Sequence, residues 1–221
     1  MSSSFQALIF DFNGTLLWDT PLHNLAWDRY LKRHAISISD AEKNRLLHGK
    51  TNNEIFRLLL QRPLDPEELA ACSEEKESIY RELCLDRKIQ LAHGATELFA
   101  WCRGHTIPMA IATSSYRPNV DFFIEQFDLL QWFERDLIIY NDGNIRSKPD
   151  PQIFLIASEK LAVRPADLII FEDSLAGIQS AEAAGAGKII VVNSNRDSDL
   201  TSPHLIIDSL IDFDCEHWLR N

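Results

Sequence analysis

The chain of 221 residues lacks several features that would assign it to common classes of protein. It has no excess of basic residues, because 22 lysines and arginines stand against 33 aspartates and glutamates and leave a net charge of −11. A chain this acidic does not attract nucleic acid or an anionic membrane surface through its overall charge. No apolar run is long enough to span a bilayer. We therefore predict neither nucleic acid nor a membrane as a partner.

Cysteine is scarce, and its spacing suits neither a metal nor a disulfide framework. The four cysteines form no CxxC pair and no metal-ligand pattern; they are Cys72, Cys84, Cys102 and Cys215. We expect free thiols in a reducing compartment. Residues 1–4 have neither the basic start nor the apolar stretch of a signal peptide, so we expect a cytoplasmic location.

Charged and apolar residues occur in the proportions of a folded globular protein, at 25% and 45% of the chain. This composition excludes an intrinsically disordered chain. The length suits one α/β domain with an insertion, or two modest domains. We find no internal repeat and no low-complexity segment.

Short apolar runs rich in β-branched residues predict buried parallel strands. They cover residues 5–10, 107–112, 137–140, 168–171, 188–192 and 205–207. Helical patterns lie between most of them, at residues 95–103, 119–127, 151–161 and 175–184. Strands that alternate with helices indicate right-handed βαβ units. The predicted fold class is therefore α/β, with a Rossmann-like, mainly parallel sheet and helices on both faces.

One long stretch interrupts this alternation and predicts an all-helical insertion. Helical periodicity recurs at residues 22–34, 41–47, 53–60 and 67–87, with Asp65 as a cap for the last helix. We expect a core domain of residues 1–17 and 92–221, and a helical cap domain of residues 18–91 that covers the strand ends like a lid. Lys76 and Arg81, in the last cap helix, are expected to be solvated.

Four segments place polar groups after predicted strands. They are Asp11-Phe12-Asn13-Gly14-Thr15, Thr113-Ser114-Ser115, Lys148-Pro149 and Glu172-Asp173-Ser174. Each segment alone has an ordinary explanation as a turn, a helix cap or a solvated loop charge. In an open α/β sheet, however, such ends converge on one crevice. Together they supply a nucleophile, hydroxyls, a cation and a pair of carboxylates.

This combination of groups meets the demands of phosphoryl transfer. A phosphate monoester is anionic, so an attacking carboxylate needs its charge neutralised. Asp11 and Asp173 are suited to share one Mg²⁺, which prefers oxygen ligands. Lys148 supplies a further positive charge, and the hydroxyls of Thr113 and Ser114 can hold phosphoryl oxygens.

The order and spacing of these segments resemble the haloacid dehalogenase-like hydrolases over nearly the whole chain. Residues 11–15 are similar to the first motif of that family, Asp-x-Asp-Gly-Thr, and residues 171–178 to its fourth. The segment at residues 147–154 resembles its third motif. The helical insertion is similar to the small cap of the subgroup that holds β-phosphoglucomutase, phosphoglycolate phosphatase and sugar-phosphate phosphatases.

The resemblance implies a role for each matching position. Asp11 is implied to be the nucleophile, which forms a phospho-aspartate and also binds Mg²⁺. The backbone carbonyl of Asn13 and the carboxylate of Asp173 are implied as further metal ligands, with Glu172 orienting metal-bound water. The implied phosphate-binding residues are Thr113, Ser114 and Lys148.

Asn13 is the main departure from the family pattern, which has a second aspartate there as general acid and base. An amide donates a hydrogen bond to a leaving-group oxygen but cannot deliver a proton or take one from water. Since general acid–base catalysis contributes roughly 10²–10⁴-fold, we expect turnover to be severely impaired. The intact remaining motifs favour an engineered substitution over an inactive lineage, and an asparagine codon in the native gene would contradict this.

Three positions of the insertion, Trp18, Lys50 and His23, are candidates for contact with substrate. Trp18 either lines the pocket or packs at the hinge. The hexose-phosphate mutase pattern has an arginine where this chain has Asn52, and Lys50 either substitutes for that arginine or is solvated. His23 either faces the crevice or packs on the helix near Trp27.

The sequence thus predicts a Mg²⁺-dependent phosphatase for a small phosphorylated metabolite, most simply a sugar phosphate, with Asn13 impairing this chain. Two alternatives remain open. One is a β-phosphoglucomutase-like phosphotransferase, which would depend on a bisphosphate. The other is a protein that binds phosphate compounds without turnover. We expect a monomer.

Overall fold

The computed structural model describes residues 5–39, 42–43, 52–197 and 200–219. It divides the chain into two compact units, one of Met1–Trp18 with Gln90–Asn221 and one of Asp19–Ile89. Each unit is described by itself below. In the described part of the chain, no helix has both the length and the apolar character needed to cross a membrane.

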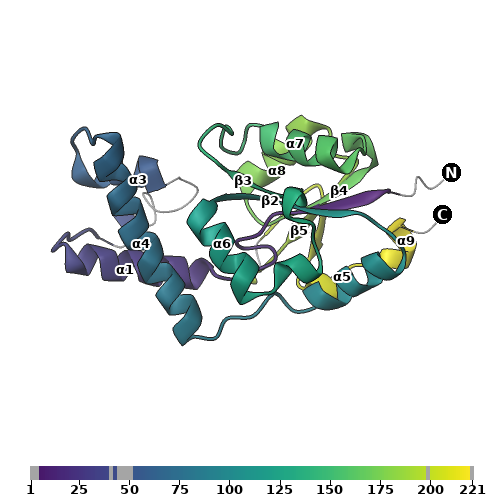
Figure 1. Ribbon diagram of the computed structural model, residues 1–221, viewed down its shortest axis with the longest axis horizontal. Coiled ribbons are helices and arrows are strands. Elements are labelled where there is room, and N and C mark those ends of the chain that lie inside the picture. Colours follow the sequence, from purple (N-terminus) through teal and green to yellow (C-terminus); the bar gives the residue numbers. More distant parts are fainter. Residues whose placement is uncertain (1–4, 40–41, 44–51, 198–199, 220–221) are drawn as a thin grey trace. The chain divides into compact units, whose positions relative to one another are not determined.

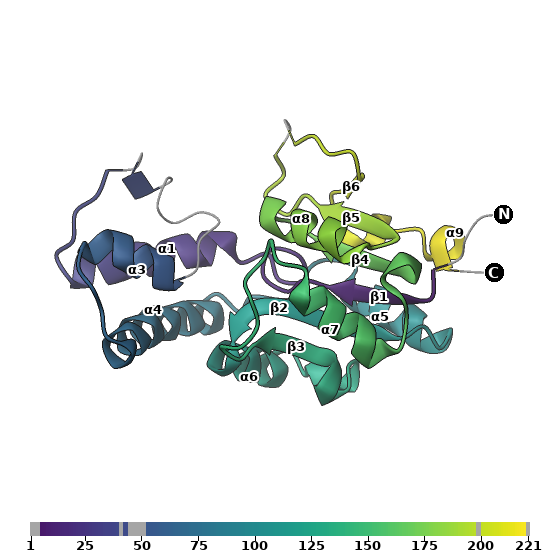
Figure 2. The same ribbon diagram turned by 90° about the horizontal axis from the view of Figure 1, so that it is seen from above.

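The first unit is built on a six-stranded sheet in the order β3-β2-β1-β4-β5-β6, which can be followed strand by strand in Figure 2. Every neighbouring pair is parallel, which confirms the predicted α/β class. The strands are β1 Ala7–Phe10, β2 Met109–Tyr116, β3 Ile138–Asn141, β4 Leu168–Glu172, β5 Lys188–Val192 and β6 Leu205–Ile207. Their continuous apolar sequences arise because a parallel sheet is covered on both faces.

Strand β2 differs most from its prediction, because it continues through Tyr116 instead of ending at Ala112. Its last four residues, Thr-Ser-Ser-Tyr, have no apolar signal, so they were expected to follow the strand. The next helix begins at Arg117 after Tyr116 and has no side-chain cap bond, so the interpretation of these polar residues as a helix cap is wrong.

Helices cover both faces of the sheet (Figure 1). Helices α7 Gln152–Leu161 and α8 Leu175–Ala184 pack on one face, where Ile9, Ala110 and Ile170 join residues of both helices in one apolar cluster. The other helices of this unit are α5 Ala95–Gly104, α6 Arg117–Gln126 and α9 Cys215–Leu219, with short 3₁₀ turns at η1 Leu129–Gln131, η2 Arg135–Leu137, η3 Pro165–Asp167 and η4 Leu210–Asp212.

An aromatic cluster fills the opposite face of the sheet. The ring of Phe10 lies 4.8 Å from that of Phe171 and 5.6 Å from that of Phe99 on α5. Phe99 also contacts Phe133 and Trp132, at 5.0 and 5.9 Å between ring centroids. Because Ile9 and Phe10 point to opposite faces, this central strand is buried on both sides just before its chain reaches Asp11.

The regular elements in the described part of the second unit are helices: α1 Thr20–Arg33, α3 Asn52–Leu60 and α4 Pro66–Asp86. Helix α4 contacts both α1 and α3, and the rings of Trp27, Tyr30 and Phe56 pack together in its core. The predicted cap is confirmed, because the Asp65 side chain accepts a hydrogen bond from the backbone N–H of Glu68 at 2.8 Å. Most of the helix predicted at residues 41–47 lies outside the described residues, as does Lys50.

We predict that Phe99→Ala lowers the free energy of unfolding by about 3–5 kcal/mol, because it leaves a cavity beside the three aromatic rings that contact Phe99. Urea unfolding followed by circular dichroism measures this loss. Leu155→Ala is the control, since Leu155 lies on α7 and is 42% exposed. A loss no larger than that of the control would contradict the role of the aromatic cluster.

Candidate active site

The polar strand ends meet where the sheet order reverses. After β1 the chain builds β2 and β3 on one side and then returns to build β4 on the other, so the switch point lies between β1 and β4. Ligands bind at such points in open α/β sheets. Asp11 directly follows β1, and its backbone N–H donates to the carbonyl of Phe171 on β4 at 3.0 Å. Glu172 ends β4, so carboxylates from two adjacent strands lie side by side.

Lys148 reaches this point from the connection between β3 and α7. Its Nζ donates to Asp11 Oδ1 at 2.6 Å, to Glu172 Oε1 at 2.5 Å and to the carbonyl of Ala112 at 3.3 Å. The same Nζ lies 4.8 Å from the centroid of the Phe154 ring. The lysine and both carboxylate side chains are less than a tenth exposed. One buried cation therefore joins the ends of β1 and β4 to the middle of β2.

Burial and charge act in opposite directions on Lys148. Burial alone lowers the pKa of an amine, because it disfavours the charged form. The carboxylates of Asp11 and Glu172 outweigh this effect and raise the pKa of Lys148 above its usual value. The side chain therefore stays cationic across the whole physiological pH range.

Glu172 uses both of its oxygens within the protein. Oε1 accepts from Lys148, while Oε2 accepts from the backbone N–H of Asp173 at 2.9 Å and from the N–H and hydroxyl of Ser174, both at 3.0 Å. A Cβ added at Gly177 would lie 1.8 Å from Oε1, so the first turn of α8 needs glycine beside this carboxylate. Ser174 also caps α8 by accepting from the N–H of Gly177 at 3.0 Å.

Gly14 shapes the turn after Asp11 and brings it against Asp173. Its φ of +86° is one that residues with a side chain rarely adopt. A Cβ at this position would lie 2.1 Å from Asp173 Oδ2, so the backbone and the carboxylate are in direct contact. Thr15, fully buried, also approaches Asp173 Oδ1 with its hydroxyl, at a long 3.4 Å.

The carboxylates of Asp11, Glu172 and Asp173 form a cluster that fits a divalent cation. Each can offer one oxygen such that all three oxygens lie within 4.8 Å of one another. A hard cation such as Mg²⁺ prefers carboxylate oxygens of this kind. Lys148 alone does not balance three negative charges, so the chemistry of this donor set suits an added cation.

Thr113, Ser114 and Ser115 lie in an irregular part of β2. Thr113 is opposite Tyr140 of β3, whereas the next paired residue, Tyr116, is opposite Asn141. The two serines between them therefore form a bulge, a device that redirects side chains beside functional sites. Thr113 is buried and accepts from the N–H of Ser115 at 3.1 Å, while Ser114 is exposed.

Ser115 contacts Asn13, although Ser115 was not among the predicted site residues. Its hydroxyl donates to Asn13 Oδ1 at 2.6 Å, across 102 residues of sequence. No local sequence signal identifies this contact, because it depends on a bulge that forms only when β2 pairs with its neighbours.

The helical unit holds a second set of buried polar groups. Lys76 is only 2% exposed, so its expected solvation is wrong, and it pairs with Glu77 at 2.8 Å. Burial lowers the pKa of Lys76, and the Glu77 carboxylate offsets part of that shift. Lys76 Nζ also donates to His23 Nδ1 at 2.8 Å, and the opposite ring nitrogen lies 3.3 Å from Asp19 Oδ2.

Other candidate residues of the insertion are placed as follows. His23 stacks on the ring of Tyr80 at 3.9 Å, and the tyrosine hydroxyl donates to Asp19. Asn52 Nδ2 donates to Glu77 Oε1 at 2.7 Å. Trp18, the last residue of the first unit before the boundary, donates from Nε1 to a backbone carbonyl of its own turn, that of Thr15, at 3.2 Å. Contact of these residues with substrate stays a prediction.

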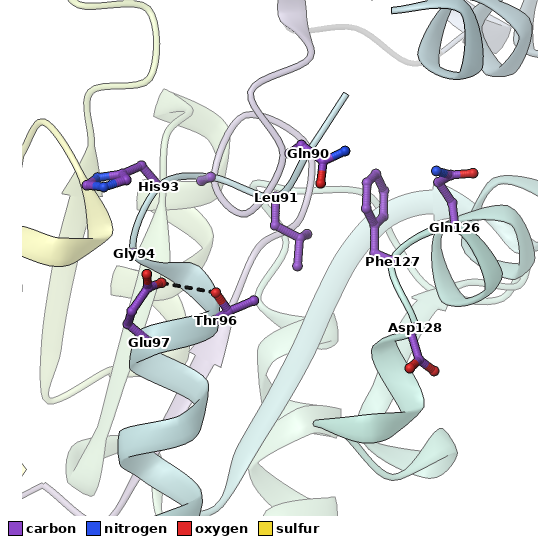
Figure 3. Close-up of a pocket in the computed structure, with 10 residues that line it drawn as sticks. Gln90, Leu91, His93, Gly94, Thr96, Glu97, Gln126, Phe127 and Asp128 are labelled. Carbon is purple, nitrogen blue, oxygen red and sulfur yellow. Dashed lines mark hydrogen bonds between the residues drawn. The ribbon is translucent and has the colours of Figure 1, made fainter. Parts of the chain in front are cut away.

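A separate hollow of about 450 Å³ lies beside the start of α5, and none of the predicted site residues that the structure describes lines it (Figure 3). Its walls carry the carboxylates of Glu97 and Asp128 but no lysine or arginine. Hydrogen bonds from its own backbone N–H and from the Thr96 hydroxyl lower the pKa of Glu97, so that wall stays anionic. The hollow is therefore unsuited to a phosphate group.

We predict that Lys148→Met destabilises the fold by about 3–5 kcal/mol at neutral pH, because it leaves two buried carboxylates without their cation. In the unmodified chain the raised pKa of Lys148 keeps its contribution constant until the pH exceeds about 10.

Urea unfolding of the unmodified chain and of Lys148→Met at about pH 7 measures this loss. Lys160→Met, which changes an exposed lysine on α7, is the matched control and is expected to have little effect. A loss in Lys148→Met no larger than that of the control would contradict the role of the buried ion pairs.

Comparisons with known proteins agree with this architecture. A family model described as haloacid dehalogenase-like hydrolase matches residues 5–185. A crystal structure of a HAD hydrolase, family IA, variant 3, from Entamoeba histolytica is 37% identical, with a TM-score of 0.89 and coverage of 97% of each chain. A phosphorylated carbohydrates phosphatase of Thermotoga maritima is 28% identical over 197 residues, covering 87% of this chain and 88% of that protein.

A fructose-1-phosphate phosphatase of Escherichia coli is 29% identical over 194 residues, covering 86% of this chain and 98% of that protein. The family match spans most of the first unit and all of the second, including the motifs around Asp11, Lys148 and Asp173. The chain therefore belongs to the haloacid dehalogenase-like hydrolase family.

Proposed function

We propose that this chain is built as a Mg²⁺-dependent phosphatase for a small phosphorylated metabolite, with sugar phosphates as the favoured class. The observation that carries this proposal is the buried Lys148 held between Asp11 and Glu172 at the switch point of the sheet. Such a site neutralises an attacking carboxylate and a phosphate together. The sugar class is supported by the relatives named as phosphatases of phosphorylated carbohydrates and of fructose 1-phosphate.

Asp11 is the proposed nucleophile. A carboxylate oxygen of Asp11 attacks phosphorus, the bond from phosphorus to the ester oxygen breaks, and an aspartyl phosphate forms. The ester oxygen leaves with its electron pair and needs a proton unless it is a weak base. Water then attacks the aspartyl phosphate, which restores Asp11 and releases inorganic phosphate.

The proposed metal site consists of the carboxylates of Asp11 and Asp173 and the backbone carbonyl of Asn13. When bound there, Mg²⁺ supplies positive charge that stabilises the phosphoryl oxygens. Glu172 supports the metal site indirectly, because both of its oxygens already accept hydrogen bonds, from Lys148 and from the backbone before α8. Its proposed role is to hold the lysine and the turn that carries Asp173 in place.

Thr113, Ser114 and Lys148 are the proposed phosphate ligands. Thr113 lies on β2, which is the neighbour of β1 in the sheet, and the bulge after it turns the next residues out of the ladder. Backbone N–H groups of the turn after Asp11 add further donors. These groups position the phosphoryl group, which is most of what phosphoryl transfer requires of a protein.

Asn13 favours a second candidate function, a protein that binds phosphate esters without turnover. The side chain keeps the hydrogen-bond donors of a binding site but has no proton to transfer at neutral pH. The two functions differ in whether restoring an aspartate at this position restores hydrolysis.

We predict that Asn13→Asp raises steady hydrolysis of p-nitrophenyl phosphate in the presence of Mg²⁺ by roughly 10²–10⁴-fold, since it restores a general base for the attack of water. The unmodified chain is expected to release a single equivalent of nitrophenolate and then to turn over slowly. Absorbance of nitrophenolate in rapid mixing measures both phases.

Asp11→Asn serves as the control and is expected to abolish the first equivalent as well. If Asn13→Asp and the unmodified chain are both silent while inorganic phosphate still binds, the phosphatase proposal fails and the binding protein takes its place.

We predict that Asp173→Asn weakens the binding of Mg²⁺ by at least roughly 10–100-fold, because one anionic ligand becomes neutral. Titration calorimetry with MgCl₂ measures this directly and does not depend on turnover. Asp167→Asn is the matched control, since Asp167 pairs with Arg164 at the opposite end of β4 and is expected to leave the affinity unchanged. Equal affinities in all three proteins would remove Asp173 from the metal site.

A further inference from the structure

We propose that Ser115 is a positioning residue that sets which face of the side chain at position 13 meets the leaving group. The inference rests on the proposed phosphatase function and adds a residue to it. Ser115 Oγ donates to Asn13 Oδ1 at 2.6 Å, a short hydrogen bond between the end of β2 and the turn after β1. Both elements belong to the same compact unit.

The backbone around Ser115 holds its hydroxyl in this direction. Ser115 lies in the bulge between the pairs Thr113–Tyr140 and Tyr116–Asn141. Its backbone N–H donates to Thr113 Oγ1 at 3.1 Å, so the bulged residue is attached to a buried threonine. A bulge redirects side chains out of the regular alternation of a strand, which here directs the serine toward the neighbouring strand end.

The orientation of the amide decides what it offers to substrate. An asparagine side chain carries an acceptor oxygen and a donor NH₂ that point in different directions within the plane of the amide. Since Ser115 occupies the oxygen, the NH₂ becomes the group presented to the ester oxygen of a bound substrate. This chain thereby places a hydrogen-bond donor where a protonated acid would place its O–H, but the amide cannot transfer a proton to the ester oxygen.

The same contact would act on an aspartate at position 13. The Ser115 hydroxyl then holds one carboxylate oxygen, and the other oxygen delivers the proton to the leaving group. Loss of Ser115 lets the carboxylate rotate, so fewer encounters have the proton in line with the ester oxygen. In the first step, formation of the aspartyl phosphate, the effect is therefore confined to substrates whose leaving group needs a proton.

Two closely matched esters separate this role from a general structural one. Phenolate is a strong base and leaves with help from an acid, whereas p-nitrophenolate is a much weaker base and leaves without it. In the Asn13→Asp background, Ser115→Ala is expected to lower the rate constant for release of the first equivalent of phenol from phenyl phosphate roughly tenfold. The corresponding rate constant for release of nitrophenolate from p-nitrophenyl phosphate, followed by rapid mixing, is expected to stay within about twofold.

Ser115→Thr keeps the hydroxyl and is expected to restore the rate with phenyl phosphate. Ser158→Ala is the matched control, because Ser158 is a buried serine whose hydroxyl also donates to an oxygen of the protein, the carbonyl of Val163, at 2.5 Å. It is expected to leave the ratio of the two rates unchanged. Equal losses of the first-step rate constant on both esters in Ser115→Ala would overturn the positioning role while leaving the phosphatase function intact.

A spectroscopic measurement tests the contact in the unmodified chain, without any turnover. The side-chain NH₂ signals of Asn13 are those missing from the ¹⁵N–¹H spectrum of Asn13→Asp. Ser115→Ala is expected to shift these signals and Ser115→Thr to return them. Unshifted signals in Ser115→Ala would overturn the proposal, whereas inactivity of Asn13→Asp toward both esters would instead count against the phosphatase function.

Discussion

The buried ion pairs of Lys148 are the interaction on which the rest of the site depends. A lysine removed from water is stable only where anionic partners compensate its lost hydration. Here the partners come from the ends of two adjacent strands, Asp11 after β1 and Glu172 at the end of β4, and the lysine comes from a third connection. The three segments can meet only if the central strands pair in this order. Correct folding of the sheet and assembly of the site are therefore the same event.

Close backbone approach is the second constraint, and it explains why glycine follows the acidic residues in both motifs. Gly14 lets the turn after Asp11 contact the carboxylate of Asp173, and Gly177 leaves space for the carboxylate of Glu172 beside α8. In both places a methyl group would occupy the position of an oxygen atom. The acidic groups are thus held by the backbone as much as by their partners, which keeps them in place before any ligand arrives.

The helical unit shows a comparable use of buried charge. Lys76 lies under the rings of Trp27 and Tyr80 and pairs with Glu77, and it donates to His23, which in turn lies beside Asp19. A charged residue on a helix is normally assigned to the solvated face, so its burial was not predictable from periodicity. It becomes stable because every neighbour in this network supplies an acceptor or an aromatic face.

The sequence by itself determined the parallel sheet, the helical insertion, the family and the residue types at the strand ends, because apolar runs and short motifs are local signals. The expectation that residue 13 cannot transfer a proton also follows from amide chemistry alone. The sequence did not reveal that β2 continues through Thr113 and forms a bulge there. Polar residues carry no apolar signal, and a bulge is defined only by the pairing of β2 with β3. Only the tertiary structure decided that Lys148 pairs twice and that Ser115 orients Asn13, because partners 137, 24 and 102 residues apart meet only in the folded chain.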